Sequence, residues 1–284
     1  MIKRSKKHWT GERLETYIFN ENTIEHLHRY AIAIEHTTNK IVLDIACGEG
    51  YGSNLLAEKA NYVYGVDISE ETVIEAKEKY IKPNLEFKSG STSSIPLEDN
   101  SIDVVVSFET IEHHKEHEQM MLEIKRVLKP TGMLIISSPD KRTYTDVSGN
   151  NNPHHVKELY FKELDSLLNR YFLNTRHHFQ KMIHGSILYQ KDAEAKYKEY
   201  VGSYDYLLQQ IEENHIYIIS LASDLDVPYL ETSTFGSKEI DEIKAQENQL
   251  DVDKAIERIT SSWSYKIGNS LLRPFSFLKK IVNG

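Results

Sequence analysis

Cysteine, long apolar runs and excess positive charge are all scarce in this 284-residue sequence. The one cysteine, Cys47, excludes an internal disulfide and is typical of a reducing compartment. No uninterrupted apolar run approaches the ~18 residues that would predict a membrane-spanning helix. The 34 Lys and Arg residues against 43 Asp and Glu give a net charge of −9. This balance argues against a dedicated nucleic-acid-binding protein, because such proteins need a positive field towards the phosphates.

The first residues read MIKRSKKHW, and no apolar segment follows them. We therefore expect no secretory signal peptide and a cytoplasmic protein. The length allows one large domain with an appendage or two modest domains. We expect three parts: an N-terminal helical lid segment over 1–38, a main domain over 39–235, and a C-terminal helical or amphipathic tail over 236–284.

Short β-rich runs alternate with amphipathic stretches between Asn39 and Ser138. This alternation predicts βαβ units and a parallel sheet. The expected strands are 41–46, 62–66, 85–88, 102–108 and 133–137, with late strands near 179–188 and 215–221. The expected helices are 21–35, 53–59, 70–80, 116–128 and 157–171. Residues 129–132, Lys-Pro-Thr-Gly, predict a turn before the fifth strand.

The first expected strand runs into a glycine-rich segment that reads LDIACGEGYG, Leu43 to Gly52. Its G-x-G-x-G spacing does not fit the G-x-G-x-x-G dinucleotide fingerprint, and it lacks the Gly-Lys-Ser/Thr of a P-loop. Asp44 and Glu49 would repel a pyrophosphate, but they would favour the ammonium and sulfonium groups of S-adenosylmethionine. Asp67 closes the second strand, where an acid can bind a ribose diol of either NAD or S-adenosylmethionine. A role as simple turn acids or helix caps stays open for Asp44 and Asp67.

Five segments, DIACGEGYG, GVDIS, SGSTSSIP, DVVVSFETIEHH and RVLKPTGMLIISSP, together resemble the class I S-adenosylmethionine-dependent methyltransferases over about 41–139. The resemblance implies a doubly wound, seven-stranded, mostly parallel α/β sheet of Rossmann-like type, with S-adenosylmethionine across the carboxyl ends of its strands. The residues it assigns to the cofactor are Asp44, Ala46, Cys47, Gly48, Gly50, Tyr51, Asp67, Ile68, Ser91, Thr92, Phe108 and Glu109. One departure is that Gly90-Ser91-Thr92 stands where the family commonly has an acid for the adenine amino group.

A narrower resemblance covers the flanks of the main domain. The segments HWTGERLETYIFNENTIEHLHRYAIA, NPHHVKEL and SWSYKIG are similar to methyltransferases found with bacterial surface-polysaccharide (O-antigen type) assembly enzymes. This resemblance implies a glycan or its precursor as the acceptor of the methyl group.

Histidines are the expected proton acceptors, because a sugar hydroxyl is a poor nucleophile and an imidazole titrates near neutral pH. His155 is the first choice for the catalytic base and His113 the second; fixing a loop or lining the cofactor wall are their structural alternatives. His114 and His117 are expected in a solvated helix start. The side chains of Glu109, Glu112, His113, His154 and His155 offer metal ligands, but their spacing matches no metal motif, so no metal is assigned.

Four residues are candidates for binding the acceptor: Arg13, Arg29, Tyr30 and His154. His26, Arg29 and Tyr30 share one face of the expected helix over 21–35. An arginine could clamp a carboxylate or phosphate of the acceptor, and the alternative is a salt bridge to a nearby acid of the chain.

The C-terminal part is more polar than the main domain. Residues 237–260 predict a solvated helix or coiled-coil arm, and the last stretch, SWSYKIGNSLLRPFSFLKK, mixes aromatic, apolar and basic residues. Two interpretations stay open: a helix that docks on this chain or a second copy, and a peripheral anchor on an anionic membrane surface.

The sequence as a whole favours an S-adenosylmethionine-dependent O-methyltransferase acting on a sugar hydroxyl of a bacterial surface glycan or its precursor. The alternatives are a small lipid, quinone or amine acceptor, and a non-catalytic partner of assembly enzymes. A nucleic-acid partner is not expected.

Overall fold

The computed structural model describes residues 20–182 and 215–236 without a break, and residues 14 and 16 before them. It further describes the backbone of 199–202 and 207–210, and residues 250, 253, 254, 256–258 and 260–262. Arg13, most of the predicted late strand at 179–188 and the basic–aromatic tail from 263 onwards lie outside these residues. The chain divides into two compact units, 1–235 and 236–284. In the second unit, the described residues from 250 to 261 have helical backbone and exposed side chains, in line with the solvated helix expected there.

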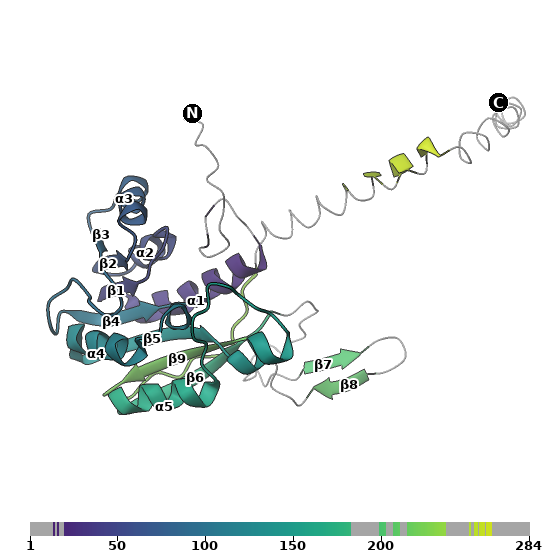
Figure 1. Cartoon of the computed structure of the whole chain (residues 1–284). Helices are drawn as coiled ribbons and strands as arrows, with labels where there is room; N and C mark the ends of the chain where they lie inside the picture. Colours follow the sequence, from purple (N-terminus) through teal and green to yellow (C-terminus); the bar gives the residue numbers. More distant parts are fainter. Residues whose placement is uncertain are drawn as a thin grey trace, which may run out of the picture. The chain divides into compact units, whose positions relative to one another are not determined.

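A seven-stranded sheet forms the centre of the first unit, with the strand order β3-β2-β1-β4-β5-β9-β6 (Figure 1). Its strands are β1 (Ile41–Ile45), β2 (Tyr62–Asp67), β3 (Leu85–Ser89), β4 (Ile102–Ser107), β5 (Leu128–Pro139), β6 (Asn174–Gln180) and β9 (Tyr217–Ser223). Only β9 runs antiparallel to its neighbours, β5 and β6. This confirms the predicted doubly wound, mostly parallel sheet. The strand order reverses between β1 and β4, and ligands of such sheets bind beside this point, at the carboxyl ends of the strands.

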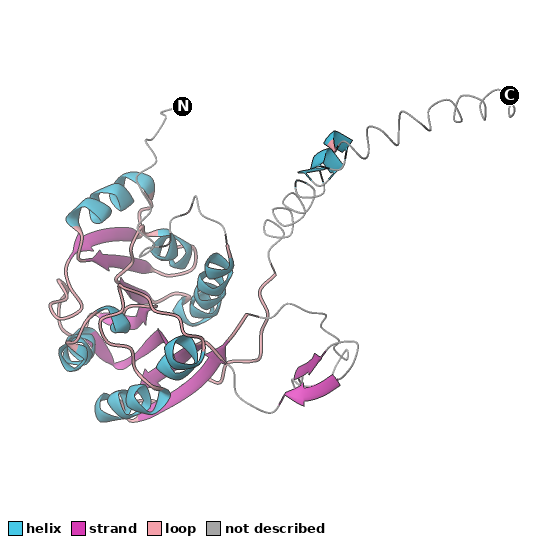
Figure 2. Ribbon diagram, turned by 45° about the vertical axis from the view of Figure 1, so that its right-hand side comes forward, coloured by secondary structure: helices cyan, strands magenta, loops and turns pink. Residues whose placement is uncertain are grey.

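Helices cover both faces of the sheet (Figure 2). One face carries α1 (Glu21–Thr37), α2 (Tyr51–Leu56) and α3 (Glu70–Lys79), and the other carries α4 (His117–Val127) and α5 (Phe161–Tyr171). Two short helical turns, η1 (Ile111–His113) and η2 (Arg142–Val147), follow β4 and β5. The backbone of β7 (Glu199–Gly202) and β8 (Leu207–Gln210) forms a separate antiparallel pair. Among the described residues, no helix is both long and apolar enough to cross a membrane.

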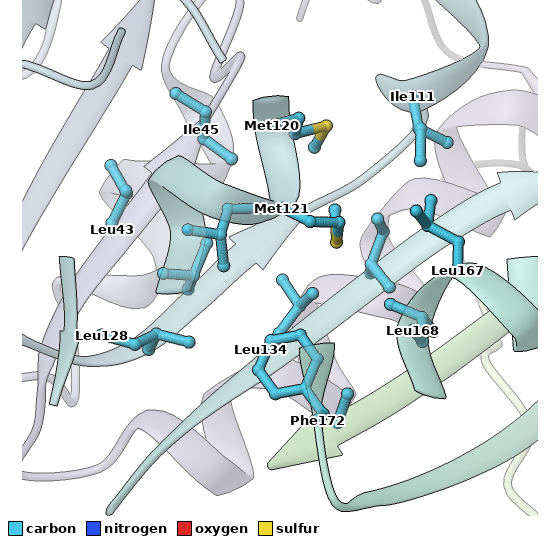
Figure 3. Close-up of a cluster of buried hydrophobic side chains, with 14 of the residues drawn as sticks. Leu43, Ile45, Ile111, Met120, Met121, Leu128, Leu134, Leu167, Leu168 and Phe172 are labelled. Atoms are coloured by element: carbon cyan, nitrogen blue, oxygen red, sulfur yellow. The ribbon is translucent and has the colours of Figure 1, made fainter. Parts of the chain in front are cut away.

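Strand β4 explains why both faces need helices. Its apolar residues alternate between two buried clusters: Val105 packs beneath α4 and α5, while Val104 and Val106 pack beneath α1 and α2. Figure 3 shows the first cluster, in which Met120 and Met121 of α4 and Leu167 and Leu168 of α5 surround Leu134 of β5. Each such side chain contributes about 1.5–3 kcal/mol when it is fully buried, so the sheet is held rigid beneath the loops at its carboxyl edge.

Several element boundaries differ from the sequence prediction. Helix α2 begins at Tyr51 rather than 53, because Gly50 takes a left-handed conformation and starts the helix. Helix α5 begins at Phe161 rather than 157, because the carbonyl of Leu159 accepts a hydrogen bond from Lys141 N–H instead. The predicted turn at 129–132 is a bulge within β5, where the register with β4 jumps from Leu128 to Met133.

The late strands also lie elsewhere than predicted. Strand β6 covers Asn174–Gln180 and ends where the prediction near 179–188 begins, and residues 181 and 182 are not in a strand. Its sequence, NTRHHFQ, is polar, so the apolar pattern placed the strand too far towards the C-terminus. Backbone pairing with β9 determines where the strand lies. Strand β9 begins at Tyr217, two residues after the predicted start.

Candidate functional site

The glycine-rich loop between β1 and α2 has the backbone shape that the sequence suggested. Ala46, Gly48 and Gly50 all have positive φ angles, of 60°, 55° and 89°. A Cβ at Gly50 would lie 2.7 Å from the Phe87 ring, so glycine is required there for space as well as for conformation. Asp67 ties this loop to the end of β2, since its Oδ2 accepts from Gly48 N at 2.9 Å and its Oδ1 accepts from Ser69 N at 3.0 Å.

A cavity of about 450 Å³ opens beside this loop. Much of its lining comes from the ends of β1 and β2 and the residues directly after β1, β2, β3 and β4. Parts of α1, η1, η2, the loop that precedes α5 and the start of β9 also contribute. The volume lies within the usual range for small-molecule sites. The predicted cofactor residues that line it are Ala46, Cys47, Gly48, Tyr51, Asp67, Ile68, Ser91, Thr92, Phe108 and Glu109.

The character of the lining suits a positively charged ligand without phosphates. Among the described residues around the cavity, five are acidic and none is Lys or Arg: Glu49, Asp67, Glu109, Glu112 and Glu116. Ile68 lines it with 72% of its side chain exposed, which offers an apolar surface for an aromatic base. Without a Lys or Arg among its described residues, this wall offers a pyrophosphate no cationic partner, whereas it attracts an ammonium and a sulfonium.

Two predicted cofactor residues, Asp44 and Gly50, lie behind the cavity wall rather than in it. Asp44 is buried and accepts hydrogen bonds from Ser53 Oγ at 2.7 Å and from the hydroxyl of Tyr30 at 3.3 Å. Burial raises the pKa of Asp44 to about 7. Tyr30 itself lines the cavity, so Asp44 fixes a wall residue from behind.

Glu49 is also less exposed to the ligand than the sequence suggested. Its carboxylate forms an ion pair with Lys79 of α3 and accepts hydrogen bonds from the backbone and side chain of Thr16 at 3.1 and 3.0 Å. Part of its charge is therefore neutralised within the chain, although Glu49 still lines the cavity.

The opposite end of the cavity is formed by histidines and acids. His113 Nδ1 lies 3.0 Å from the carbonyl oxygen of His154, and His155 Nδ1 lies 2.5 Å from Glu158 Oε1. Because a carbonyl oxygen only accepts, the proton of neutral His113 is on Nδ1 and the lone pair is on Nε2. The ring of Tyr144 stacks on His155 at 5.1 Å, and the His113 and His155 rings meet edge to face at 5.2 Å.

Glu112 lies between these imidazoles and the protein interior. It is 1% exposed, and its Oε2 has no hydrogen-bond partner. Burial, with the nearby charge of Glu109, raises the pKa of the Glu112 carboxyl well above its usual range. The Oε1 atom lies 4.0 Å from His113 Nε2.

Arg29 lies inside the wall rather than in the cavity. Its NH1 is 3.3 Å from Glu109 Oε1, its Nε donates to Gln180 Oε1 at 2.7 Å, and its guanidinium stacks over the ring of Tyr217 at 4.3 Å. Glu109 has a positive φ of 48° and also accepts from Ser137 Oγ at 2.6 Å. Arg29 thus forms a salt bridge within the chain, which is the alternative that the sequence analysis left open for it.

The remaining predicted site residues are divided between the wall and the interior. His113, His155 and Tyr30 line the cavity, whereas the side chain of His154 does not. The expectation of a solvated helix start is wrong for His117, which is 5% exposed with Nε2 2.8 Å from the His114 carbonyl. His114 lines the cavity and lies 3.4 Å from the hydroxyl of Thr92.

The sequence interpretation missed several lining residues: Asn22, Asn152 and Tyr217. Tyr217 opens β9, a strand that lies far beyond the histidine segment in the sequence. Its place depends on antiparallel pairing with β5, and no local motif signals that. Asn152 is the first residue of the segment NPHHVKEL, in which the sequence interpretation considered only the two histidines, His154 and His155.

The chain is similar to known methyltransferases. Residues 43–136 match the family model described as a methyltransferase domain. A probable S-adenosylmethionine-dependent methyltransferase of Mycolicibacterium smegmatis is 36% identical over 162 residues, which are 56% of this chain and 62% of that protein. Phthiotriol/phenolphthiotriol dimycocerosates methyltransferase 1 of Mycobacterium ulcerans is 30% identical over 135 residues, 46% of each chain. The chain spans about three fifths of the length of the first curated relatives it matches.

The solved structures agree on the fold. The PH0226 protein from Pyrococcus horikoshii superposes with a TM-score of 0.51 at 22% identity, covering 74% of this chain and 99% of that one. Residues 43–136 of the first unit are therefore similar to a methyltransferase domain, and the first curated relatives are described as probable S-adenosylmethionine-dependent methyltransferases. This confirms the broader resemblance in the sequence; the narrower one, to enzymes of surface-polysaccharide assembly, stays a prediction.

Proposed function

We propose that this chain transfers the methyl group of S-adenosylmethionine to a hydroxyl oxygen of a sugar in a bacterial surface glycan or its precursor. The observation that carries the proposal is the pair of imidazoles, His113 and His155, in the wall of the cofactor cavity. Each has its Nδ1 engaged by an oxygen acceptor of the chain, which leaves the Nε2 lone pair as the basic atom.

The chemistry of methyl transfer explains why such a pair favours an oxygen acceptor. The S–CH₃ bond breaks as the O–CH₃ bond forms in line with it, a neutral thioether leaves, and the hydroxyl proton must go to a base. A hydroxyl needs this help because the neutral hydroxyl is a weak nucleophile, whereas a neutral amine is nucleophilic enough to attack before it loses a proton. His155 is our first choice for the group that receives the proton, since Glu158 engages its Nδ1 and so orients the ring with Nε2 as the proton-accepting atom. His113 is the second.

The polar lining of the histidine end of the cavity favours a sugar as the acceptor. Around the two histidines, the cavity is lined by Tyr144, Asn152 and Tyr217, which offer aromatic faces, a hydroxyl and an amide. Such groups suit a ring that carries several hydroxyls, and the flanking sequence resembles enzymes that act on polysaccharides.

A lipid acceptor is the second candidate. One observation favours it: the relative from Mycobacterium ulcerans is described as a phthiotriol/phenolphthiotriol dimycocerosates methyltransferase. That protein shares only 46% of its length with this chain, so the acceptors need not be shared.

The test is transfer of label from methyl-labelled S-adenosylmethionine to two parallel acceptor pools, one of purified surface glycans and glycan precursors and one of extracted lipids. The expected product is a glycan with label in an O-methyl ether, located by linkage analysis. Label only in the lipid pool would replace the sugar proposal with the second candidate. Label on nitrogen or carbon would contradict an oxygen acceptor altogether.

A further inference from the structure

Three side chains at the histidine end have the composition of a metal site. Glu112, His113 and His155 each bring one potential ligand atom to within 4.8 Å of the others. Among the residues that the structure describes, no other three His, Cys, Asp or Glu side chains do so. The backbone holds the two segments together, because the Glu112 carbonyl accepts from the N–H groups of Val156 and Lys157 at 2.8 and 2.9 Å.

The two imidazoles have the surroundings of metal ligands. In protein metal sites, a ligating histidine commonly donates its other ring N–H to a carboxylate or a backbone carbonyl, which fixes its tautomer and orientation. Here Glu158 occupies that position for His155, and the carbonyl of His154 occupies it for His113. In both rings, Nε2 is then the coordinating atom.

Glu112 supplies a second and independent indication. Its side chain is 1% exposed, yet Oε2 has no hydrogen-bond partner. A buried carboxyl oxygen without a partner is costly in either protonation state, and its neighbours in the cavity wall are two imidazoles. A cation bound between these three groups would satisfy it.

We propose that Glu112, His113 and His155 bind a divalent first-row transition-metal ion. Two imidazole nitrogens and one carboxylate oxygen suit such ions better than Mg²⁺, which prefers oxygen ligands. All three residues line the cofactor cavity, so the coordination positions they leave are on the cavity side, as in catalytic metal sites.

The role of this ion rests on the proposed function. The acceptor hydroxyl coordinates the ion, which lowers the pKa of the hydroxyl, and its proton is released to water. The resulting alkoxide attacks the methyl carbon, and the S–CH₃ bond breaks. His155 is then a ligand and not the base, which replaces the role of proton acceptor given to it in the sequence analysis and under the proposed function.

The test is a titration of the chelator-treated, full-length protein with Mn²⁺, monitored by loss of the electron paramagnetic resonance signal of free Mn²⁺. One Mn²⁺ ion should bind per chain. Glu112→Gln, which removes a ligand charge at nearly constant shape, should abolish this binding. Glu158→Gln, which leaves all three ligands in place, should weaken it about 10- to 100-fold.

The matched control is His114→Ala, a histidine next to the cluster that lines the same cavity but is not part of it. This variant should bind one Mn²⁺ with unchanged affinity. Calorimetry with S-adenosylhomocysteine should show that each variant still binds the cofactor product and is therefore folded. Absence of Mn²⁺ binding to the wild-type chain, or equal affinity in the Glu112→Gln variant, would overturn the site.

An activity assay distinguishes failure of the metal site from failure of the proposed function. The labelled-methyl assay is run on chelator-treated protein, before and after Mn²⁺ is restored. If Mn²⁺ binds but no hydroxyl receives label, the site stands and the acceptor proposal fails. If label transfer survives chelation and no Mn²⁺ binds, the O-methyltransferase proposal stands and the metal site fails.

Discussion

The two ends of the cavity are built in different ways. At the cofactor end, the contiguous loop between β1 and α2 has positive φ angles at three residues, and Asp67 at the end of β2 anchors it. At the histidine end, side chains from η1, η2, the loop before α5 and β9 meet, and Arg29 supports them from behind. The first end is specified by local backbone conformation, whereas the second depends on the tertiary packing of segments far apart in sequence.

This difference indicates which end of the cavity can vary between enzymes that methylate different acceptors. A methyl donor is the same for every acceptor, so its binding loop can be a fixed local motif. The acceptor side must differ between enzymes, and side chains on loops that a rigid sheet positions can be exchanged without unfolding the domain. The comparison predicts that changes at the two ends are separable in experiment.

The largest expected effect is loss of turnover at the histidine end without loss of cofactor binding. His155→Ala should lower kcat on the order of 10²- to 10⁴-fold, as expected when a proton-accepting or metal-binding group is removed. The affinity for S-adenosylmethionine, measured by calorimetry, should change by less than about threefold. A variant that loses both together would break the comparison, because the two ends would then be coupled.

At the cofactor end, the expected effect is on folding. Gly50→Ala places a Cβ 2.7 Å from the Phe87 ring at a φ of 89°. The left-handed conformation costs about 1–2 kcal/mol and overpacking about 1–3 kcal/mol, so the free energy of unfolding in urea should fall by about 2–5 kcal/mol.

Gly149 provides a matched control for this substitution. It has a φ of 72°, but no atom lies within 4 Å of the position that an added methyl group would take. Gly149→Ala should therefore cost only the conformational part, about 1–2 kcal/mol. Equal losses in the two variants would mean that contact with Phe87 does not determine the shape of the loop.

A smaller effect is expected at Asp67, the acid that joins the loop to β2. In Asp67→Asn, an amide N–H₂ replaces one of the two carboxylate oxygens that accept from Gly48 and Ser69. Loss of a charge-assisted hydrogen bond is worth about 1.5–3 kcal/mol, so affinity for S-adenosylmethionine should fall about 10- to 100-fold in calorimetry. Asp103→Asn is the control: that acid binds Ile41 N–H at the opposite end of β1 and should leave the affinity unchanged.

The same division separates the features that could be predicted from the sequence from those that could not. The strands from β1 to β5, the glycine loop and the cofactor were predicted, because apolar runs and glycine spacing act over a few residues. Strand β6 was misplaced because NTRHHFQ has little apolar pattern and its position is set by pairing with β9. Tyr217 was missed for the same reason.

Electrostatic roles were harder to predict than positions. Asp44 and Arg29 were both expected to face a ligand, yet each is buried and paired within the wall. A sequence names a charged residue but does not give its burial, and burial decides whether a charge meets a ligand or a neighbour.

The smallest predicted effect is the pH dependence that Asp44 gives to stability. Its pKa in the folded chain is about 7, raised by burial from 3.8. In the unfolded chain Asp44 is ionised throughout the range from pH 6 to pH 8, whereas in the folded chain it loses its proton as pH passes about 7. The folded state therefore binds more protons at pH 6, and stability falls as the pH rises towards and through 7.

Asp44→Asn removes this titration while keeping an oxygen that can accept from Ser53. Relative to the variant, the wild-type chain should lose about 1 kcal/mol of unfolding free energy between pH 6 and pH 8, since one pKa unit corresponds to about 1.4 kcal/mol. Urea unfolding of both chains at the two pH values measures this difference, and other titrating groups cancel in it. Parallel behaviour of the two chains would show that Asp44 is already ionised behind Tyr30. The cofactor end would then contain a permanent buried charge, and its contrast with the acid-rich histidine end would be weaker than the geometry indicates.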